Sequence, residues 1–266
     1  MAYTFAAHMA CLIPTQPEPS STQAPLNAFA LIDAAQLLPL KRPLQRLVSD
    51  APCSLVFEES FARSALELSP LLFALSALPE TLVRQMTTLD AACQHLPVMS
   101  VIHTSLSLDE LTQHLRELLL IEADGTAYLL RFADSQMLAA ANNAITPNQR
   151  TSVMSPLHAW FVVDHQGRLN DAADIKTYPQ AQPAAPLPLV LDAAQTHALL
   201  TGAAVPTLAS QVRHLDERFA QKLSHAQQTE FIGQCIAAAR DAGVDDENEL
   251  MSLTLQRWQT EQSRAA

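Results

Sequence analysis

The chain has very few glycines and lacks the motifs through which glycine-rich loops bind phosphate groups. Five glycines occur among 266 residues, where an average usage of about 7% would give roughly 19. None lies in G-x-G-x-x-G or G-x-x-x-x-G-K-[ST] spacing, so no loop is expected to wrap its N–H groups around a nucleotide. The sequence also has no G-x-S-x-G, no H-E-x-x-H and no spaced Cys/His set for zinc. We therefore expect no cofactor, no metal and no enzymatic activity.

Positive charge is scarce as well. The chain has 16 Lys and Arg against 27 Asp and Glu, a formal net charge of -11. Its densest basic cluster is Lys41, Arg42 and Arg46, three residues that would cover about one face of a single helix. Proteins that bind nucleic acid usually gather more Lys and Arg into one patch, because those side chains displace counterions from phosphates. Nucleic acid and anionic membrane surfaces are therefore disfavoured as partners.

Long hydrophobic runs and paired cysteines are missing too. The most apolar stretch, Leu66–Leu78, contains Glu67 and Pro70 and is shorter than the roughly 20 residues of a membrane helix. The four cysteines are scattered without a C-x-x-C pair, as expected for small buried side chains in a reducing compartment. No Lys or Arg precedes Lys41, whereas a secretion signal begins with positive charge. The sequence predicts a cytoplasmic protein that does not enter the membrane.

Two proline-rich stretches divide the chain. PTQPEPSSTQAP and YPQAQPAAPLP have little charge and read as loosely ordered or semi-rigid segments. Hydrophobic residues make up 48% of the chain, enough for a sizeable core. The expected organisation is a flexible leader at 1–26, an α/β domain at 27–176, a proline-rich linker at 177–189 and a helical lobe at 190–266.

Short apolar runs alternate with helical patterns in the larger part, which favours an α/β fold. Ser107 and Glu110 form a capping box at the start of the clearest helix, and Asp124-Gly125 predicts a turn. Leucines recur at helical spacing behind that capping box, on the face expected to be core. Strands are expected at 29–32, 53–57, 70–75, 98–103, 126–132 and 159–163, and helices at 37–48, 80–95, 107–119 and 134–145.

The smaller part shows helical patterns and no strand signal. One helix stripe is expected to carry Val212, Leu215, Phe219 and Leu223. Further signals predict a helix start at Ser224 with Gln227, a stop at Gly243, and a last helix that begins at Asp246 and carries Trp258. The prediction is a small all-α lobe of three or four helices.

Polar residues with possible chemistry each have a structural alternative. Glu110 and His114 could share a metal, or form an exposed i, i+4 pair. Asp33 closes the first strand, where it could be functional or could cap a turn. His103 ends a strand near Ser105, but a nucleophile also needs a base and an orienting acid nearby.

Arg131 and Asp134 flank a junction at which a strand is expected to become a helix. Asp134 could cap that helix while Arg131 pairs with a carboxylate, or the junction could shape a docking surface. Both readings stay open from the sequence.

The order of several segments resembles a known family. FALIDAA (29–35), SLVFEES and SPLLFAL (54–75), SLDELTQHLRELLLIEADGTAYLLRFADSQML (107–138) and HAWFVVDHQGRL (158–169) occur in succession. This succession is similar to the effector chaperones, or adaptors, of bacterial type VI secretion, often called Tap or Tec. It covers roughly 27–170. Arg131, Phe132 and Asp134 match the R-F-Y-D-P-R junction of such proteins, whereas Ala133, Ser135 and Gln136 depart from it.

The resemblance implies a cytosolic protein that binds an effector toxin and helps load it onto the VgrG spike. An apolar segment of the cargo would lie in a groove. Phe219, Leu223 and Trp258 are candidate contacts, with burial inside the helical lobe as the alternative. Arg131, Phe132 and Asp134 complete the predicted protein-binding set.

Two other functions remain open at this point. One is a hydrolase or transferase with an unrecognised site around Asp33, His103 and Arg131, which would have to lie in one pocket. The other is a regulatory or structural domain without cargo.

Overall fold

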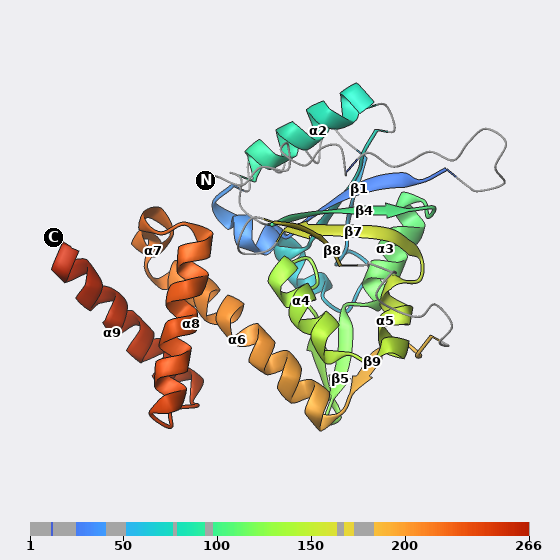
Figure 1. Ribbon diagram of the computed structural model, residues 1–266. Helices are drawn as coiled ribbons and strands as arrows, with labels where there is room; N and C mark the ends of the chain where they lie inside the picture. Colours follow the sequence, from blue (N-terminus) through green and yellow to red (C-terminus); the bar gives the residue numbers. More distant parts are fainter. Residues whose placement is uncertain are drawn as a thin grey trace. The chain divides into compact units, whose positions relative to one another are not determined.

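The computed structural model describes residue 12 and residues 25–40, 52–76, 79–93, 98–163, 168–172 and 184–265 (Figure 1). The chain divides into two compact units, one ending at Leu199 and one spanning Leu200–Ala266. The first alternates strands with helices and the second is helical, so the predicted fold class is confirmed. None of the described helices combines the length and the apolar character that a bilayer-spanning segment needs.

The first unit is built on a six-stranded sheet within the described residues. Its strand order is β2-β3-β1-β4-β7-β8, and each neighbouring pair is antiparallel. The central strand β1 is buried along nearly its whole length, as its run of apolar residues predicts. The strands are β1 (Asn27–Ile32), β2 (Cys53–Leu55), β3 (Leu71–Ala74), β4 (Met99–Thr104), β7 (Leu157–Val163) and β8 (Leu169–Asp171).

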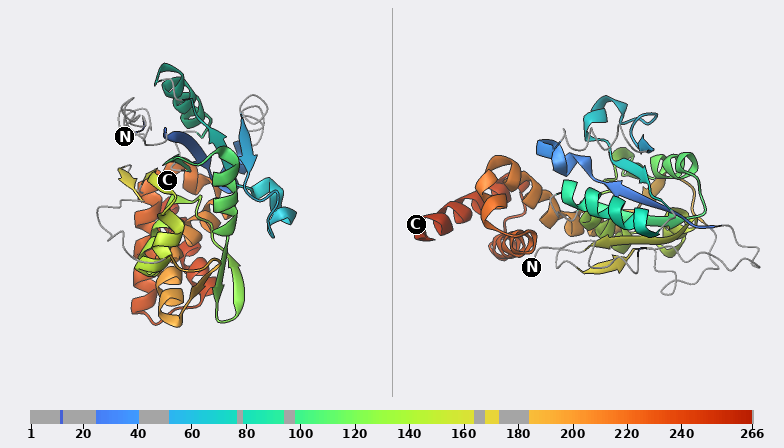
Figure 2. Two further views of the ribbon diagram at one scale, coloured as in Figure 1. Left: turned by 90° about the vertical axis from the view of Figure 1, so that its right-hand side faces the viewer. Right: turned by 90° about the horizontal axis from the view of Figure 1, so that it is seen from above.

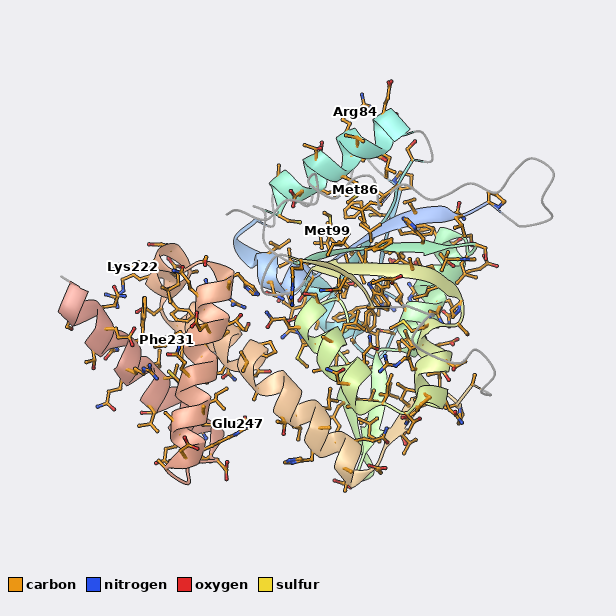
Figure 3. All side chains as sticks on the ribbon, in the orientation of Figure 1. Arg84, Met86, Met99, Lys222, Phe231 and Glu247 are labelled. Carbon is orange, nitrogen blue, oxygen red and sulfur yellow. The ribbon has the colours of Figure 1, made fainter. Side chains whose placement is uncertain are left out.

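The two faces of this sheet pack into separate cores. On one face, Met86 of α2 (Pro79–Ala92) and Met99 of β4 belong to the same cluster (Figure 3). On the other face, Phe29 and Ile102 pack with the helices α3 (Leu108–Glu117), α4 (Ser135–Ala144) and α5 (Pro147–Met154). Figure 2 shows α2 separated from α3 and α4 by the sheet. This division follows from the period of two in strands, which sends alternate side chains to opposite faces.

A second, smaller sheet has the order β6-β5-β9. The predicted Asp124-Gly125 turn joins β5 (Leu120–Ala123) to β6 (Thr126–Leu129), with φ of 51° and 72° at its two residues. Such left-handed angles suit the tight turn of a two-residue hairpin. β9 (Leu189–Leu191) pairs with β5 in parallel.

The helix α3 begins as predicted. Ser107 Oγ accepts from the Glu110 N–H at 3.3 Å, and Glu110 Oε2 accepts from the Ser107 N–H at 2.8 Å. Leu111 and Leu115, on the predicted stripe, are fully buried. A capping box of this kind satisfies free N–H groups at the helix start from within four residues, which is why the sequence alone reveals it.

The helical unit contains most of α6 (Ala193–Leu215), with α7 (Glu217–Lys222), α8 (His225–Asp241) and α9 (Glu247–Ala265). The Ser224 capping box is present, and Gly243, with φ of 78°, follows the end of α8 as predicted. Its core gathers residues of α6, α8 and α9 around Phe219 of α7.

The single stripe predicted from Val212 to Leu223 is wrong as one helix. Asp216 has an extended backbone and caps α7 through a bond from the Arg218 N–H at 3.0 Å, so the helix is interrupted there. As a result Leu215 is 61% exposed, whereas Val212 and Phe219 are fully buried. Asp favours such a cap because its carboxylate competes for backbone N–H groups, and this local preference overrode the apolar spacing.

The boundaries differ from those predicted. Residues 189–191 form β9, and the first unit ends at Leu199, so residues 190–199 belong to the α/β unit and not to a helical lobe. A three-residue strand is too short to give a periodic signal. Most of the predicted leader and linker, at 1–26 and 177–189, lies outside the described residues, as does 41–48 of the predicted helix at 37–48.

Candidate functional site

A polar cluster joins the end of β1 to the start of α4. We call Asp33, Gln36, Arg131 and Asp134 the Asp33–Arg131 cluster. Arg131 Nη2 lies 3.2 Å from Asp33 Oδ2 and 3.9 Å from Asp134 Oδ2. Gln36 Nε2 donates to both of these carboxylate oxygens at 3.0 Å. The cluster therefore ties together segments 98 residues apart in the chain.

Each carboxylate of the cluster also shapes its own backbone. Asp33 Oδ1 accepts from the Ala35 N–H at 3.1 Å, which begins the 3-10 turn η2 (Ala34–Leu40). Asp134 Oδ1 accepts from the N–H groups of Gln136 and Met137 at 2.9 and 3.3 Å and caps α4. The predicted capping role of Asp134 and the predicted pairing of Arg131 with a carboxylate are both present in the structure.

The cluster contains two carboxylates and one guanidinium, and the carboxylates are more deeply buried than the guanidinium. The side chains of Asp33 and Asp134 are 4% and 10% exposed, against 37% for Arg131. Burial raises the pKa of Asp134, and the nearby Asp33 raises it further, while Arg131 and the capping N–H groups act in the opposite direction. Two buried carboxylates thus share one guanidinium that reaches the surface.

The three residues of the predicted enzyme site do not meet. Asp33 follows Ile32, which pairs with Met99, whereas His103 pairs with Ala28. At about 3.3 Å per residue, Asp33 and Ala28 are roughly 17 Å apart along β1. His103 Nε2 instead lies 3.1 Å from the carbonyl oxygen of Leu12, and burial lowers the pKa of its ring. The structure joins Asp33 to Arg131 and leaves His103 near the other end of the strand.

The predicted metal pair is also separated. The Glu110 carboxylate is held by Ser107, while His114 Nε2 lies 2.9 Å from the carbonyl oxygen of Val153. His114 is half-buried, not exposed as predicted. In the part of the chain that the structure describes, no group of three or more His, Cys, Asp or Glu is arranged to hold a metal.

Most of the predicted protein contacts lie in cores. Phe132 is 2% exposed and meets Trp160 edge-on, with 6.0 Å between ring centroids. Phe219 and Trp258 are 0% and 1% exposed and 5.1 Å apart, and Leu223 packs against the same cluster. These side chains stabilise their own units, so a partner reaches them only if a unit rearranges. Their role in binding stays a prediction.

A polar hollow of about 510 Å³ lies beside α3. Arg116 borders it and is anchored by donating to Glu59 Oε2 at 2.7 Å and to the Val56 carbonyl at 3.2 Å. The hollow is lined by Cys53, Ser54, Glu58, Glu59, Leu108, Asp109, Thr112, Gln113 and Arg116. Acidic groups outnumber the one basic group, and that group is already paired.

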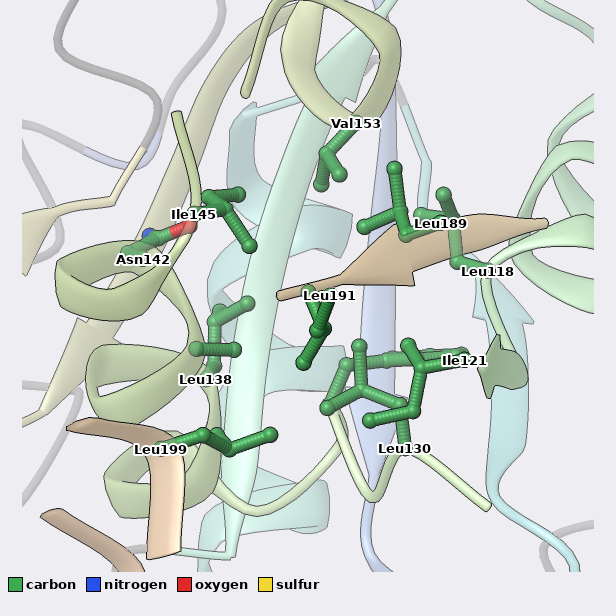
Figure 4. A pocket seen from close by; sticks show the side chains of 12 residues that line it. Leu118, Ile121, Leu130, Leu138, Asn142, Ile145, Val153, Leu189, Leu191 and Leu199 are labelled. Carbon is green, nitrogen blue, oxygen red and sulfur yellow. The ribbon is translucent and has the colours of Figure 1, made fainter. Parts of the chain in front are cut away.

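A smaller apolar cavity lies between α4, β9 and the start of α6 (Figure 4). Its free volume of about 10 Å³ is at the lower limit for one water molecule. Asn142 donates to the Ala172 carbonyl at 3.4 Å, but its Oδ1 has no partner among the described residues. The other lining side chains are apolar, so a water would find too few partners and the cavity is a packing defect.

Strand β6 is open to solvent along its whole length. All four of its residues are exposed, and Tyr128 and Leu129 are 51% and 39% accessible. Val190 of β9, on the same small sheet, is 60% exposed. Within the described residues β6 lies at the edge of its sheet, with β5 on one side only. We call Thr126–Leu129 the β6 edge.

Residues 28–152 match the family model DUF4123, a domain of unknown function. This DUF4123 region makes up somewhat less than half of the chain. It runs from β1 into α5, so it includes the Asp33–Arg131 cluster and the β6 edge, while the helical unit lies outside it. Comparisons with curated proteins and with solved structures give no match.

Sequence reasoning missed Gln36 and the β6 edge. Gln36 follows Asp33 at the three-residue spacing of a capping pair, a signal that could have been read. Nothing in the sequence indicated that β6 would be exposed. TAYLL resembles a buried strand, and only the tertiary structure leaves it at an edge.

Proposed function

We propose that this chain is a cytoplasmic adaptor that binds a type VI secretion effector and helps load it onto the VgrG spike. The observation that carries the proposal is the DUF4123 match over residues 28–152, because this domain is in general associated with type VI effector adaptors. The succession of segments described from the sequence supports the same assignment. On this proposal the chain acts by binding and not by catalysis.

The open β6 edge supports a binding role. An unpaired strand edge is a template for another polypeptide, and most proteins cover or shorten such edges. Here the edge lies inside the DUF4123 region and carries exposed apolar side chains. A surface of this kind suits a protein partner.

The Asp33–Arg131 cluster has a positioning role in this proposal. Arg131 follows Leu129, the last residue of β6, after one intervening position, and its guanidinium pairs with Asp33. Asp134 then starts α4. The cluster would hold the chain where β6 leaves the small sheet, and so would keep the β6 edge in place.

Co-purification and secretion together test the function. The full chain is expressed with a candidate type VI effector and with a VgrG spike protein from the same organism, and secretion of the effector is assayed with and without this chain. We expect the effector to be retained on the purified chain and its secretion to be lost on deletion. If neither partner is retained and secretion continues without this chain, the proposal is wrong.

A further inference from the structure

We propose that the β6 edge binds an extended segment of the partner protein as an added β-strand. This inference rests on the adaptor function proposed above and adds to it the place and form of binding.

The ladder of the hairpin leaves defined backbone groups unpaired. In a two-residue hairpin the pair that flanks the turn, here Ala123 and Thr126, exchanges hydrogen bonds, and bonded pairs then recur at every second position. The Leu130 N–H donates to the Leu119 carbonyl at 2.8 Å, in phase with that pattern. The N–H and C=O groups of Ala127 and Leu129 therefore point away from β5. No described residue pairs with them on that side.

The side chains beside this edge indicate what the added strand carries. In register, Val190, Glu122 and Ala127 form one row across the outer face of the small sheet, and Leu120 with Leu129 forms the next. Glu122 has no hydrogen-bonding or ionic partner among the described residues. An added strand would lie about 4.8 Å beyond β6 and so roughly 10 Å from β5. A long cationic side chain could reach Glu122 across the small Ala127.

The same geometry predicts an apolar residue two positions along the added strand, because side chains two apart share a face. That residue would pack against Leu129, which is 39% exposed. The occupant is thus an extended segment with Lys or Arg opposite Ala127 and an aliphatic residue opposite Leu129.

A second copy of this chain fits the edge less well. Stable protein interfaces use roughly 20–30 residues on each side, whereas β6 offers four. Each copy also carries a net charge of -11, so two copies repel one another. A cationic segment from a larger partner avoids the repulsion and can add contacts elsewhere.

Two substitutions test the edge in the full chain. Ala127→Pro removes an outward N–H without removing a bond to β5, the position at which an edge strand tolerates proline. Leu129→Lys places a charge where the apolar contact is expected. Leu66→Lys is the matched control, because Leu66 lies in the same unit and is 38% exposed against 39% for Leu129. Circular dichroism confirms that each variant is folded.

The measurement is the affinity of the purified chain for the candidate type VI effector used in the co-purification. We expect Ala127→Pro to weaken binding by roughly two- to tenfold, as the loss of one interfacial backbone bond predicts. Leu129→Lys should weaken binding by a similar factor or more, because it places a charge where the apolar contact is expected. Leu66→Lys should bind as the wild type does. Residue-resolved amide exchange gives a second readout that needs no variant. The Ala127 and Leu129 amides should become protected in the complex, while the Tyr128 amide, already bonded to β5, changes little.

The outcomes separate the two proposals. If the wild type binds the effector but both variants bind equally well and the Ala127 and Leu129 amides stay unprotected, the added strand is refuted and the adaptor function stands. If the wild type does not bind the effector, the adaptor function fails and this inference fails with it. If these amides become protected because the chain self-associates, as sedimentation would reveal, the assigned occupant is wrong.

Discussion

Replacing Trp258 by alanine tests whether this side chain is a core residue of the helical unit or a contact for a partner. Trp258 is 1% exposed and meets Phe219 and Phe231 edge-on, at centroid distances of 5.1 and 5.9 Å. Its indole N–H donates to Asp216 Oδ2 at 3.1 Å. Removing a buried Trp costs about 3–5 kcal/mol through lost burial and the cavity left behind. A unit of this length is stable by only about 3–10 kcal/mol, at roughly 0.05–0.15 kcal/mol per residue.

We therefore expect Trp258→Ala to bring the helical unit close to unfolding. With a urea dependence of about 1–3 kcal/mol per molar, the midpoint should fall by at least about 1 M. Far-UV circular dichroism follows the helices. The variant keeps Trp160 as its only tryptophan, and this residue is fully buried in the first unit, so its fluorescence reports that unit alone. The dichroism transition should move while the Trp160 transition stays in place.

The milder Trp258→Phe keeps a buried ring and should leave the unit folded. If Trp258 acts only through the core, this variant binds the effector as the wild type does. Overlapping unfolding curves for Trp258→Ala and the wild type would refute the burial argument. Normal stability with lost binding would make Trp258 a direct contact instead.

Two further predictions concern buried or paired carboxylates. Hydrogen bonds, chiefly from the Arg218 side chain, hold the pKa of Asp216 at about 2. The Asp216 carboxylate therefore contributes fully to the free energy of unfolding above its ordinary pKa of roughly 4, and this contribution is lost as the pH falls towards 2. The urea midpoint of Asp216→Asn should depend less on pH across that window than the wild-type midpoint, and equal slopes would contradict the assignment. Asp134→Ala should lower the unfolding free energy by about 1 kcal/mol through loss of a helix cap, while Asp134→Asn, which retains a cap, should cost less. Because burial and Asp33 raise the pKa of Asp134 in the fold, wild-type stability should fall relative to Asp134→Asn as pH rises through that pKa. Chemical denaturation at several pH values checks this sign.

The elements that could be predicted are those whose signals are local. The Ser107 and Ser224 capping boxes, the Asp124-Gly125 turn and the stop at Gly243 all involve partners within a few residues. Their energetics depend little on the rest of the chain. The same holds for Asp134, whose capping of α4 follows from its place before an apolar helical pattern.

Long-range features could not be predicted in this way. The pairing of Asp33 with Arg131 joins residues 98 positions apart, and their contact depends on where β1 lies in the sheet. The separation of His103 from Asp33 follows from the antiparallel register of β1 and β4. One sequence contains no signal for register between distant strands, because many pairings bury similar apolar surface.

The amino-acid sequence alone determined the fold class, the starts and stops of several helices, and the scarcity of motifs for phosphate and zinc. Only the tertiary structure decided that Phe219 and Trp258 are buried, that β9 completes the small sheet, and that β6 is left at its edge. Hydrophobicity and capping act over a few residues and are visible in one segment. Burial and free edges depend on which distant segments pack together, and that is a property of the whole fold.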